Sequence, residues 1–567
     1  NTLGYCPLGF SLDMGRSGKS FGKKKPLSGK QKKEQLRAKR AKKEAASHPS
    51  TDIDQVLLHE HKQDPERYFI RFINLSQAEV DHAKALGTVP FSEASPLSLQ
   101  SLLDKTRQPA LPNRPRWSYD WTPEELATSE REGFETWLSE SIHVEERQHP
   151  TKGHMQMEVP KALSYFETNL NIYRQLWRVV ERSDIVAVIT DARIPLAHCP
   201  CNIVDFVATF CDYSGRGQTL DEDAPHPRFH EAVVGKPVVI ILNKADLVPA
   251  SVVEDWRQFL LTAYSESVVG VLAVSSQQLR TDPASRAAFD ADLIRTVRTS
   301  LGVEAPGKVA IGLVGQPSVG KSSLLNGIVG HKVVSVKRTP GHTKHFQTHF
   351  LDCEGALQSA RQSGIEVDPS LSKEDSRSVM LVDCPGLVIP TMGCTVEVEA
   401  DPIRQTLLSK ALQVATGVFP QARTREYYSS VRLLMEAVPG FWEAFITSKP
   451  FAPLGKAYRL AQGIEETVEE GDAEGEEGEE GVEEEEGIQR LFHHGVAGIP
   501  HTPHAFLASV ATYKNFLNKG GAPDVHRAGH AVLKACVDGK VAFHVPPPPP
   551  ETQVETQAQA QPEVSDS

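Results

Sequence analysis

A glycine-rich octapeptide, GQPSVGKS at residues 315–322, carries the clearest chemistry in the sequence. It fits the pattern G-x-x-x-x-G-K-[ST], and it lies between a predicted buried strand at residues 309–314 and a predicted helix at residues 323–329. In such a unit, backbone N–H groups surround phosphate oxygens and the helix N-terminus adds a favourable dipole. We expect Lys321 to contact the β- and γ-phosphates and the Ser322 hydroxyl to bind Mg²⁺. A chance match in a loop is the alternative, and the flanking strand and helix argue against it.

The tetrapeptide NKAD at residues 243–246 predicts which base accompanies the phosphates, and it follows a β-branched run at residues 236–242 that predicts a strand. An ionised Asp246 can accept hydrogen bonds from two donors on one edge of guanine, whereas adenine lacks the 2-amino group. Such a site can reject the wrong base by roughly 10⁴-fold. We expect Asn243 to hold the loop and the carbonyl edge of the base, and the stem of Lys244 to lie along the base plane. Alone, NKAD is also a common polar turn.

The tetrapeptide DCPG at residues 383–386 follows a further predicted strand and completes the phosphate side of the site. Asp383 would lie beside Mg²⁺ through water, and the Gly386 N–H would meet the γ-phosphate. A threonine upstream can complete the Mg²⁺ shell when the γ-phosphate is present. We favour Thr343 over Thr339 because the Pro-Gly turn between them directs the later residue inward.

Two serines at the end of the predicted strand at residues 268–274 offer backbone N–H groups to the guanine carbonyl, although any strand end can carry serines. The predicted catalytic residues are Lys321, Thr343 and Gly386, and the predicted Mg²⁺ ligands are Ser322, Thr343 and Asp383. The predicted nucleotide-binding residues are Asn243, Lys244, Asp246, Ser275, Ser276, Gly315, Gln316, Pro317, Ser318, Val319, Gly320, Lys321, Ser322, Asp383 and Gly386.

The order of these motifs along the chain is unusual. Ordinary small GTPases carry the phosphate loop first and N-K-x-D later, whereas here NKAD precedes the serines, the phosphate loop and DCPG. This order predicts a circular permutation, which is physically tolerable because domain termini are often close together. The chain then leaves the domain directly after DCPG, so we expect the following segment to respond to the nucleotide.

With this motif order, the sequence resembles the circularly permuted GTPases of the YlqF/YawG family, and its eukaryotic branch in particular. Further matching segments are FETNL at 166–170, RQLWR at 174–178, DARIP at 191–195, VVSV at 333–336, TPGHT at 339–343, FQT at 346–348 and the basic KKKPLS at 23–28. The resemblance covers residues 110–400 well and the C-terminal third in patches. It implies an α/β fold, with a mostly parallel sheet covered by helices on both faces, and a small helical C-terminal domain.

The same resemblance implies binding of GTP and GDP with Mg²⁺, slow GTP hydrolysis, and work on ribosome assembly with pre-ribosomal particles or rRNA as partners. Ser318 stands where the family commonly has the Asn linked to potassium-assisted hydrolysis, which argues against potassium stimulation. Leu387 stands where other GTPases place a water-orienting Gln. Hydrolysis should therefore be slow or partner-assisted, since unaided Ras-like rates are only about 10⁻⁴ s⁻¹. A nucleotide-regulated scaffold with negligible turnover is the alternative function, and NKAD argues against an ATPase or kinase.

Composition sets the wider frame of this chain of 567 residues with a formal net charge of −12. No apolar run is long enough to span a membrane, and residues 1–14 lack the pattern of a signal peptide, so no membrane partner is expected. The chain does not begin with Met, and Met14 is a candidate start. The eight scattered cysteines suit a reducing compartment.

The motifs and the resemblance, together with charge and composition, predict a series of regions along the chain. They are a disordered basic tail at 1–50, a partly helical region at 51–165, the permuted GTPase domain at 166–392, a helical domain at 393–545 with an acidic disordered insert at 464–487, and a disordered tail at 546–567. The basic tail is typical of a nuclear or nucleolar signal and an RNA contact, or of a plain solvated arm. We expect the nucleus or nucleolus, with the cytoplasm as the alternative, and no DNA sequence specificity.

Several elements are also predicted locally. Thr122 followed by Pro123 and Glu125 predicts the start of a helix. Tyr173, Leu176, Trp177 and Val180 recur at helical spacing and predict core packing, while polar inserts at 213–233 and 354–377 predict surface loops.

Overall fold

The computed structural model describes residues 71–91, 102–103, 108–143, 145–148, 155–158, 163–214, 233–302, 309–334, 347–351, 353–362, 379–392, 402–461 and 500–548. All of these residues fall in one compact unit, Tyr68–Ser567. The basic tail at 1–50, the acidic insert at 464–487, residues 549–567 and the candidate Mg²⁺ ligand Thr343 lie outside the described residues. Among the described helices, none combines the length and the apolar content that a membrane span requires.

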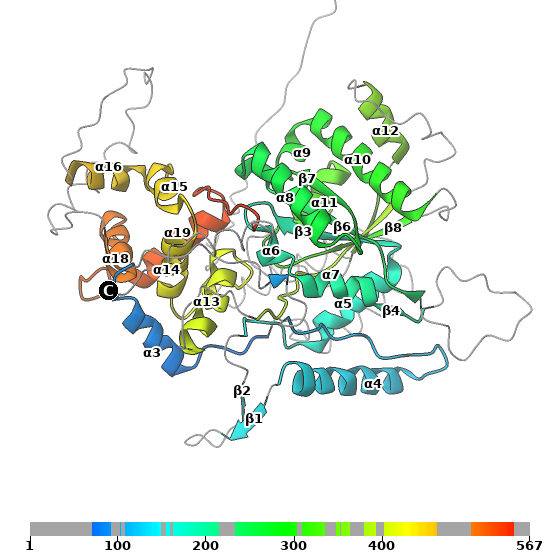
Figure 1. The fold of residues 1–567 in the computed structure, drawn as a ribbon, viewed down its shortest axis with the longest axis horizontal. Helices are drawn as coiled ribbons and strands as arrows, with labels where there is room; N and C mark the ends of the chain where they lie inside the picture. Colours follow the sequence, from blue (N-terminus) through cyan, green and yellow to red (C-terminus); the bar gives the residue numbers. More distant parts are fainter. Residues whose placement is uncertain are drawn as a thin grey trace, which may run out of the picture. The chain divides into compact units, whose positions relative to one another are not determined.

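A six-stranded sheet in the order β7-β6-β3-β8-β10-β9 organises the middle of the chain (Figure 1). Its strands are β3 (Ile185–Asp191), β6 (Val238–Asn243), β7 (Val268–Val274), β8 (Val309–Val314), β9 (Gln347–Leu351) and β10 (Val379–Asp383). All neighbours pair in parallel except β9, which runs antiparallel to β10 at the edge. Strands β3, β6 and β8 are buried at every position, as expected for a sheet covered on both faces. The predicted α/β class with a mostly parallel sheet is confirmed.

Alternate residues of the central strand β3 face two separate hydrophobic cores. Val186 and Val188 belong to the first core, whereas Ile185, Ala187 and Ile189 belong to the second. The helices of the first face are α5 (Leu170–Arg182), α7 (Cys201–Thr209) and α8 (Ala250–Ala263), and those of the second are α9 (Gln278–Thr281), α10 (Pro283–Leu301), α11 (Lys321–Val329) and α12 (Cys353–Gln362) (Figure 1). The period of two along the strand therefore produces the predicted helical layer on each side.

Two helices follow their sequence signals closely. In α5 the residues at helical spacing, Tyr173, Leu176, Trp177 and Val180, are all 0% exposed, so the predicted core packing is confirmed. Helix α4 (Pro123–Thr136) begins where predicted, because Thr122 and Glu125 form a reciprocal capping box. The prediction that the insert at 354–377 is a surface loop is wrong for its first part. That part forms α12, which packs against α10 and includes the buried Ala360.

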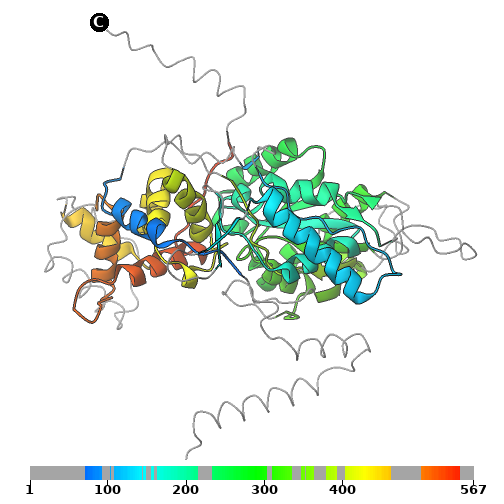
Figure 2. The same cartoon turned by 90° about the horizontal axis from the view of Figure 1, so that it is seen from below.

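A set of helices follows the sheet in the chain. They are α13 (Pro402–Ala415), α14 (Tyr428–Ala437), α15 (Phe441–Thr447), α16 (Ala452–Ala461), α18 (Pro503–Tyr513) and α19 (Val525–Val537). Helix α3 (Gln77–Leu86), from the other end of the described chain, packs against α13 and α14 (Figure 2). Its Glu79 carboxylate accepts a hydrogen bond from the buried Lys410 ammonium at 2.9 Å. We call the helices α3, α13, α14, α15, α16, α18 and α19 the helical region.

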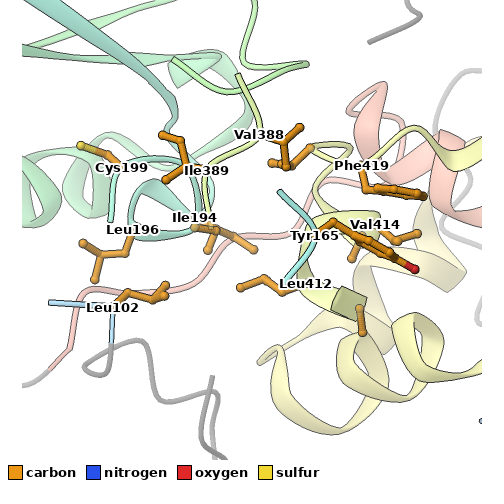
Figure 3. Packing of buried hydrophobic residues seen from close by; sticks show 14 of the residues in the cluster. Leu102, Tyr165, Ile194, Leu196, Cys199, Val388, Ile389, Leu412, Val414 and Phe419 are labelled. Carbon is orange, nitrogen blue, oxygen red and sulfur yellow. The ribbon is translucent and has the colours of Figure 1, made fainter. Parts of the chain in front are cut away.

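The helical region shares one hydrophobic core with the first face of the sheet. Val388 and Ile389, which follow DCPG, belong to the same core as Leu412 of α13 (Figure 3). The ring of Tyr165 stacks on that of Phe419 at a centroid distance of 3.8 Å. The segment that leaves the sheet after DCPG is therefore packed directly against α13.

Shorter elements complete the described chain. They are β1 (Glu145–Gln148), β2 (Met155–Glu158), β4 (Cys211–Asp212), β5 (Val233–Val234), α6 (Pro195–His198), the π-helical turn η2 (Trp137–Ser141) and the 3₁₀ turns η3 (Ala245–Leu247) and η5 (Gln421–Arg423).

Candidate functional site

The predicted motifs all lie at the same edge of the sheet. Strand β6 ends at Asn243, β7 ends one residue before Ser275, β8 ends one residue before Gly315 and β10 ends at Asp383. These strands are parallel, so their carboxyl ends meet, and ligands of open α/β sheets bind in the crevice at that edge. Motifs separated by up to 140 residues in sequence are thus neighbours in space.

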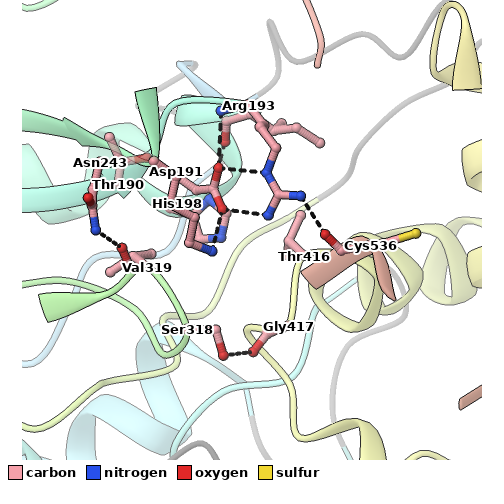
Figure 4. Close-up of polar contacts among 12 residues, drawn as sticks. Thr190, Asp191, Arg193, His198, Asn243, Ser318, Val319, Thr416, Gly417 and Cys536 are labelled. Carbon is pink, nitrogen blue, oxygen red and sulfur yellow. Dashed lines mark hydrogen bonds and ion pairs between the residues drawn. The ribbon is translucent and has the colours of Figure 1, made fainter. Parts of the chain in front are cut away.

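The side-chain amide of Asn243 joins three motifs. Its Nδ2 donates to the Val319 carbonyl in the phosphate loop at 2.7 Å (Figure 4). Its Oδ1 accepts from the Ser276 N–H at 3.1 Å and from the Ser276 hydroxyl at 2.7 Å. Asn243 is only 1% exposed, so every one of these bonds replaces lost water contacts. The Ser276 N–H, which the sequence assigned to the guanine carbonyl, is directed at Asn243 in this structure.

The phosphate loop has the backbone that its glycines predict. Gly320 has φ 93° and forms the N-cap of α11, and a Cβ there would lie 2.4 Å from the Asn243 Nδ2. Ser318 also adopts a left-handed conformation, with φ 65°. Its hydroxyl donates to the Gly417 carbonyl at 2.8 Å, beyond the end of α13, so the helical region touches the phosphate loop itself (Figure 4).

Lys321 is the first residue of α11, and its ammonium lies within the phosphate loop. Its Nζ donates to the carbonyls of Gly315 at 2.8 Å and Gln316 at 2.7 Å. Burial lowers the pKa of Lys321 to about 8, and nearby Asp383 opposes this shift. A nucleotide phosphate would supply the anion that a buried ammonium requires.

Asp383 and Ser322 form an oxygen-rich pair beneath the loop. The Ser322 hydroxyl donates to Asp383 Oδ2 at 3.4 Å, while Asp383 Oδ1 is buried with no hydrogen-bond partner among the described residues. Burial raises the pKa of Asp383 to about 6, and Lys321 opposes the shift. A hydroxyl beside an unsatisfied carboxylate oxygen is a donor set that suits a hard cation such as Mg²⁺.

The loop after Asp383 lies close to the phosphate loop. A Cβ on Gly386 would lie 3.2 Å from Pro317 Cα and 3.3 Å from Lys321 Nζ, so a side chain there would push the two loops apart by a few tenths of an ångström. Leu387 is 1% exposed and belongs to the first core. The residue at the position of the water-orienting Gln therefore points into the protein interior.

The base-side loop is held by charges that sequence reasoning did not place. Lys244 has φ 62°, and its ammonium donates to Asp191 Oδ2 at 2.7 Å. Burial lowers the pKa of Lys244, and Asp191 opposes this shift. Asp246 follows in η3 and is exposed. Asp191 belongs to the DARIP segment, whose position at the end of β3, beside β6, is the signal that connects it with NKAD.

The structure thus brings the described candidate residues to one edge, where their individual contacts with a ligand remain predictions. They are Asn243, Lys244, Asp246, Ser275, Ser276, Gly315, Gln316, Pro317, Ser318, Val319, Gly320, Lys321, Ser322, Asp383 and Gly386.

Comparison with known proteins adds independent information. Residues 310–429, which include the phosphate loop and DCPG, match the family of 50S ribosome-binding GTPases. The chain is 29% identical over 451 residues to guanine nucleotide-binding protein-like 1 of Homo sapiens, which covers 66% of this chain and 62% of that protein. It is 29% identical over 363 residues to GTPase LSG1-1 of Arabidopsis thaliana, which covers 58% of this chain and 54% of that protein. The chain therefore spans less than two thirds of the length of these relatives.

Among solved structures, GNP-bound YlqF from T. maritima is similar over 66% of this chain and 96% of that one, with 16% identity and a TM-score of 0.30.

Proposed function

We propose that this chain, whose residues 310–429 belong to the family of 50S ribosome-binding GTPases, is a guanine-nucleotide switch that hydrolyses GTP slowly and acts in ribosome assembly. The observation that carries the proposal is the Asn243 amide, which ties the base-reading loop to the phosphate loop with a 2.7 Å bond to Val319. A single nucleotide can then reach both loops.

In this proposal the phosphate loop binds the α- and β-phosphates through its N–H groups, and Lys321 turns from its carbonyl partners toward the β- and γ-phosphates. Ser322, and Asp383 through water, would hold Mg²⁺, which would supply positive charge to the β- and γ-phosphates. Thr343, which lies outside the described residues, would complete the Mg²⁺ shell in the GTP state. Asp246 reads the two guanine donors, and the Gly386 N–H meets the γ-phosphate.

Slow turnover follows from Leu387. Its buried side chain has no polar atom with which to orient an attacking water molecule, so it cannot assist the chemical step as a glutamine would. A partner that supplies a polar group would accelerate it. The same feature supports the second candidate function, a nucleotide-regulated binding scaffold with negligible turnover.

The nucleotide state reaches the helical region through residues 387–392. This segment pairs with residues 163–169: the Glu167 N–H donates to the Val388 carbonyl at 3.0 Å and the Ser164 N–H to the Thr391 carbonyl at 2.9 Å. Gln413 of α13 then donates to the Tyr165 carbonyl at 2.9 Å and to the Ser164 hydroxyl at 3.1 Å. A shift of the DCPG loop upon loss of the γ-phosphate would therefore move α13.

The ribosomal target is supported by the family description and by the dense Lys and Arg residues of the 1–50 tail, which suit RNA phosphates. On the same grounds we propose pre-ribosomal particles or rRNA as partners and the nucleus or nucleolus as the place of action, with the cytoplasm as the alternative.

The direct test of the nucleotide site is Lys321→Ala against Lys332→Ala, an exposed lysine just beyond the end of α11. We expect Lys321→Ala to lose GTP and GDP binding, because the buried ammonium that would contact the phosphates is removed. Lys332→Ala should bind both nucleotides like the wild type. Equal nucleotide affinity in all three proteins would contradict the assignment.

Base reading is tested by Asp246→Asn, which should shift preference from guanine to xanthine nucleotides. Unchanged GTP selectivity would disprove the role of Asp246.

Co-sedimentation with ribosomal subunits in GTP, GDP and no nucleotide tests the cellular role. Nucleotide-dependent binding supports the switch, and binding that ignores the nucleotide contradicts it. Hydrolysis measured with and without the subunits, in potassium and in sodium, separates switch from scaffold. Turnover that stays at background in every condition favours the scaffold.

A further inference from the structure

We propose that Asp191 and Arg193 are positioning residues for base recognition, and that through them the docked end of helix α19 sets the affinity for guanine nucleotides. This inference rests on the proposed function and adds a specificity determinant to it. It arises from a buried cluster of one carboxylate and two cations at the base-side loop, of which only Lys244 is among the predicted nucleotide contacts.

Asp191 is the centre of this cluster and is 2% exposed. Its Oδ2 accepts hydrogen bonds from the Lys244 ammonium at 2.7 Å and from Arg193 Nη2 at 2.8 Å. Its Oδ1 accepts from Arg193 Nε at 3.0 Å and from the Arg193 N–H at 3.1 Å (Figure 4). The carboxylate is thus gripped on both oxygens, and the end of the Lys244 side chain is fixed by it.

Arg193 connects the cluster to the helical region. Its Nη1 donates to the Cys536 carbonyl in the last turn of α19, where the negative end of the helix dipole favours a cation (Figure 4). Its backbone carbonyl accepts from the Val545 N–H at 2.9 Å, and its guanidinium lies 5.5 Å from the centre of the Phe543 ring. Arg193 is 3% exposed, so a guanidinium that lost one partner would stay buried without compensation.

The end of α19 also touches the base-side loop directly. A Cβ on Gly539 would lie 2.6 Å from the side chain of Leu247, the last residue of η3. Gly539 has φ 76°, which favours glycine, and its lack of a side chain permits this close approach. Gly539 therefore packs directly against the turn that carries Lys244 and Asp246.

Fixing the ammonium of Lys244 has a consequence for the base. The aliphatic stem between its backbone and its ammonium is then ordered before a ligand arrives, and stacking a base against an ordered stem costs less conformational entropy. Loss of Asp191 would free the stem and leave the ammonium poorly compensated. The base is common to GTP and GDP, so this effect must be equal for both and cannot mimic a γ-phosphate effect.

The test is a double-mutant cycle in the full chain with Asp191→Asn and Lys244→Met, using a fluorescent GDP and a fluorescent GTP analogue. We expect each single change to weaken both nucleotides by about tenfold, and the double variant to be no weaker than Lys244→Met alone. Additive losses would overturn the proposal, because Asp191 would then act independently of Lys244. A loss for one nucleotide only would overturn it as well.

A matched control is Lys236→Met, which breaks another buried pair at the opposite end of β6, Lys236 Nζ with Asp212 Oδ2 at 2.9 Å. We expect its nucleotide affinity to match the wild type. If Asp191→Asn does not fold, Arg193→Lys replaces it in the test. This variant keeps a cation beside Asp191 but loses the branched guanidinium that reaches both Asp191 and Cys536. Its loss of affinity should also vanish in the Lys244→Met background. Failure of the wild type to bind guanine nucleotides would instead refute the proposed function.

Discussion

The side-chain amide of Asn243 links the NKAD loop to the phosphate loop. Asn243 makes its bonds to Val319 and Ser276 away from water, and a truncated side chain would leave buried donors and acceptors unpaired. Asn326 offers a comparison, because its buried amide also bridges backbone groups, at Val333 and Val334.

We expect Asn243→Ala to lower the free energy of unfolding by about 1–3 kcal/mol, the usual cost of unsatisfied buried groups, and to weaken GDP binding as well. Asn326→Ala should lose a similar amount of stability with little change in GDP affinity. Urea unfolding together with a GDP titration measures both quantities. Equal loss of affinity in the two variants would show that only stability is involved.

The charge state of Asp383 gives a pH-dependent prediction. Burial raises its pKa from 3.8 to about 6 in the folded protein, so between these values the folded state binds a proton that the unfolded chain releases. The free energy of unfolding without ligand therefore falls as pH rises through this window. Asp383→Asn should remove the share of Asp383 and flatten this dependence, while Glu167 and Asp290, whose pKa values burial raises to about 7, keep theirs. The variant should also lose Mg²⁺-dependent GTP binding at pH 7.5. Calorimetry from pH 4 to 7 checks it, and an unchanged slope in the variant would contradict the assignment.

At the scale of elements, local sequence patterns predicted many of the helices and strands. The capping residues of α4 and the helical spacing in α5 each predict their element, because burial and capping are decided within a few residues. The four motifs predict the residues at the site's edge, because each follows an apolar strand. Hydrogen bonds between residues far apart in the sequence could not be predicted from such local patterns. Lys244 with Asp191 and Ser318 with Gly417 join residues whose chemistry gives no sign of a partner so distant in sequence.

Helix α13 yields a prediction at this scale. Gln413→Leu removes the donor that links α13 to Ser164 and Tyr165, and it keeps most of the side-chain volume. We expect GDP affinity within about twofold of the wild type, because additivity holds for sites without shared partners, while the difference between GTP and GDP in ribosomal co-sedimentation disappears. The control is Gln421→Leu, whose amide makes a single long bond to Val414 at 3.4 Å. A preserved nucleotide difference in Gln413→Leu would show that α13 takes its signal elsewhere.

At the scale of the whole molecule, motif order alone predicted the permutation, because a cut in the chain changes connectivity and leaves the parallel sheet intact. The expected region at residues 51–165 gave no sign that α3 packs against α13 and α14. The sequence of an amphipathic helix does not show which other helix it packs against, and only the folded chain shows that contact.

The position of α3 bears on how the polypeptide is synthesised. Glu79 and Lys410 are 331 residues apart in the chain, so α3 leaves the ribosome long before its docking site exists. At translation speeds of 5–20 residues per second, the interval is roughly 15–70 seconds. During that time Val80 and Ala83, the buried residues of this early helix, have no native cover.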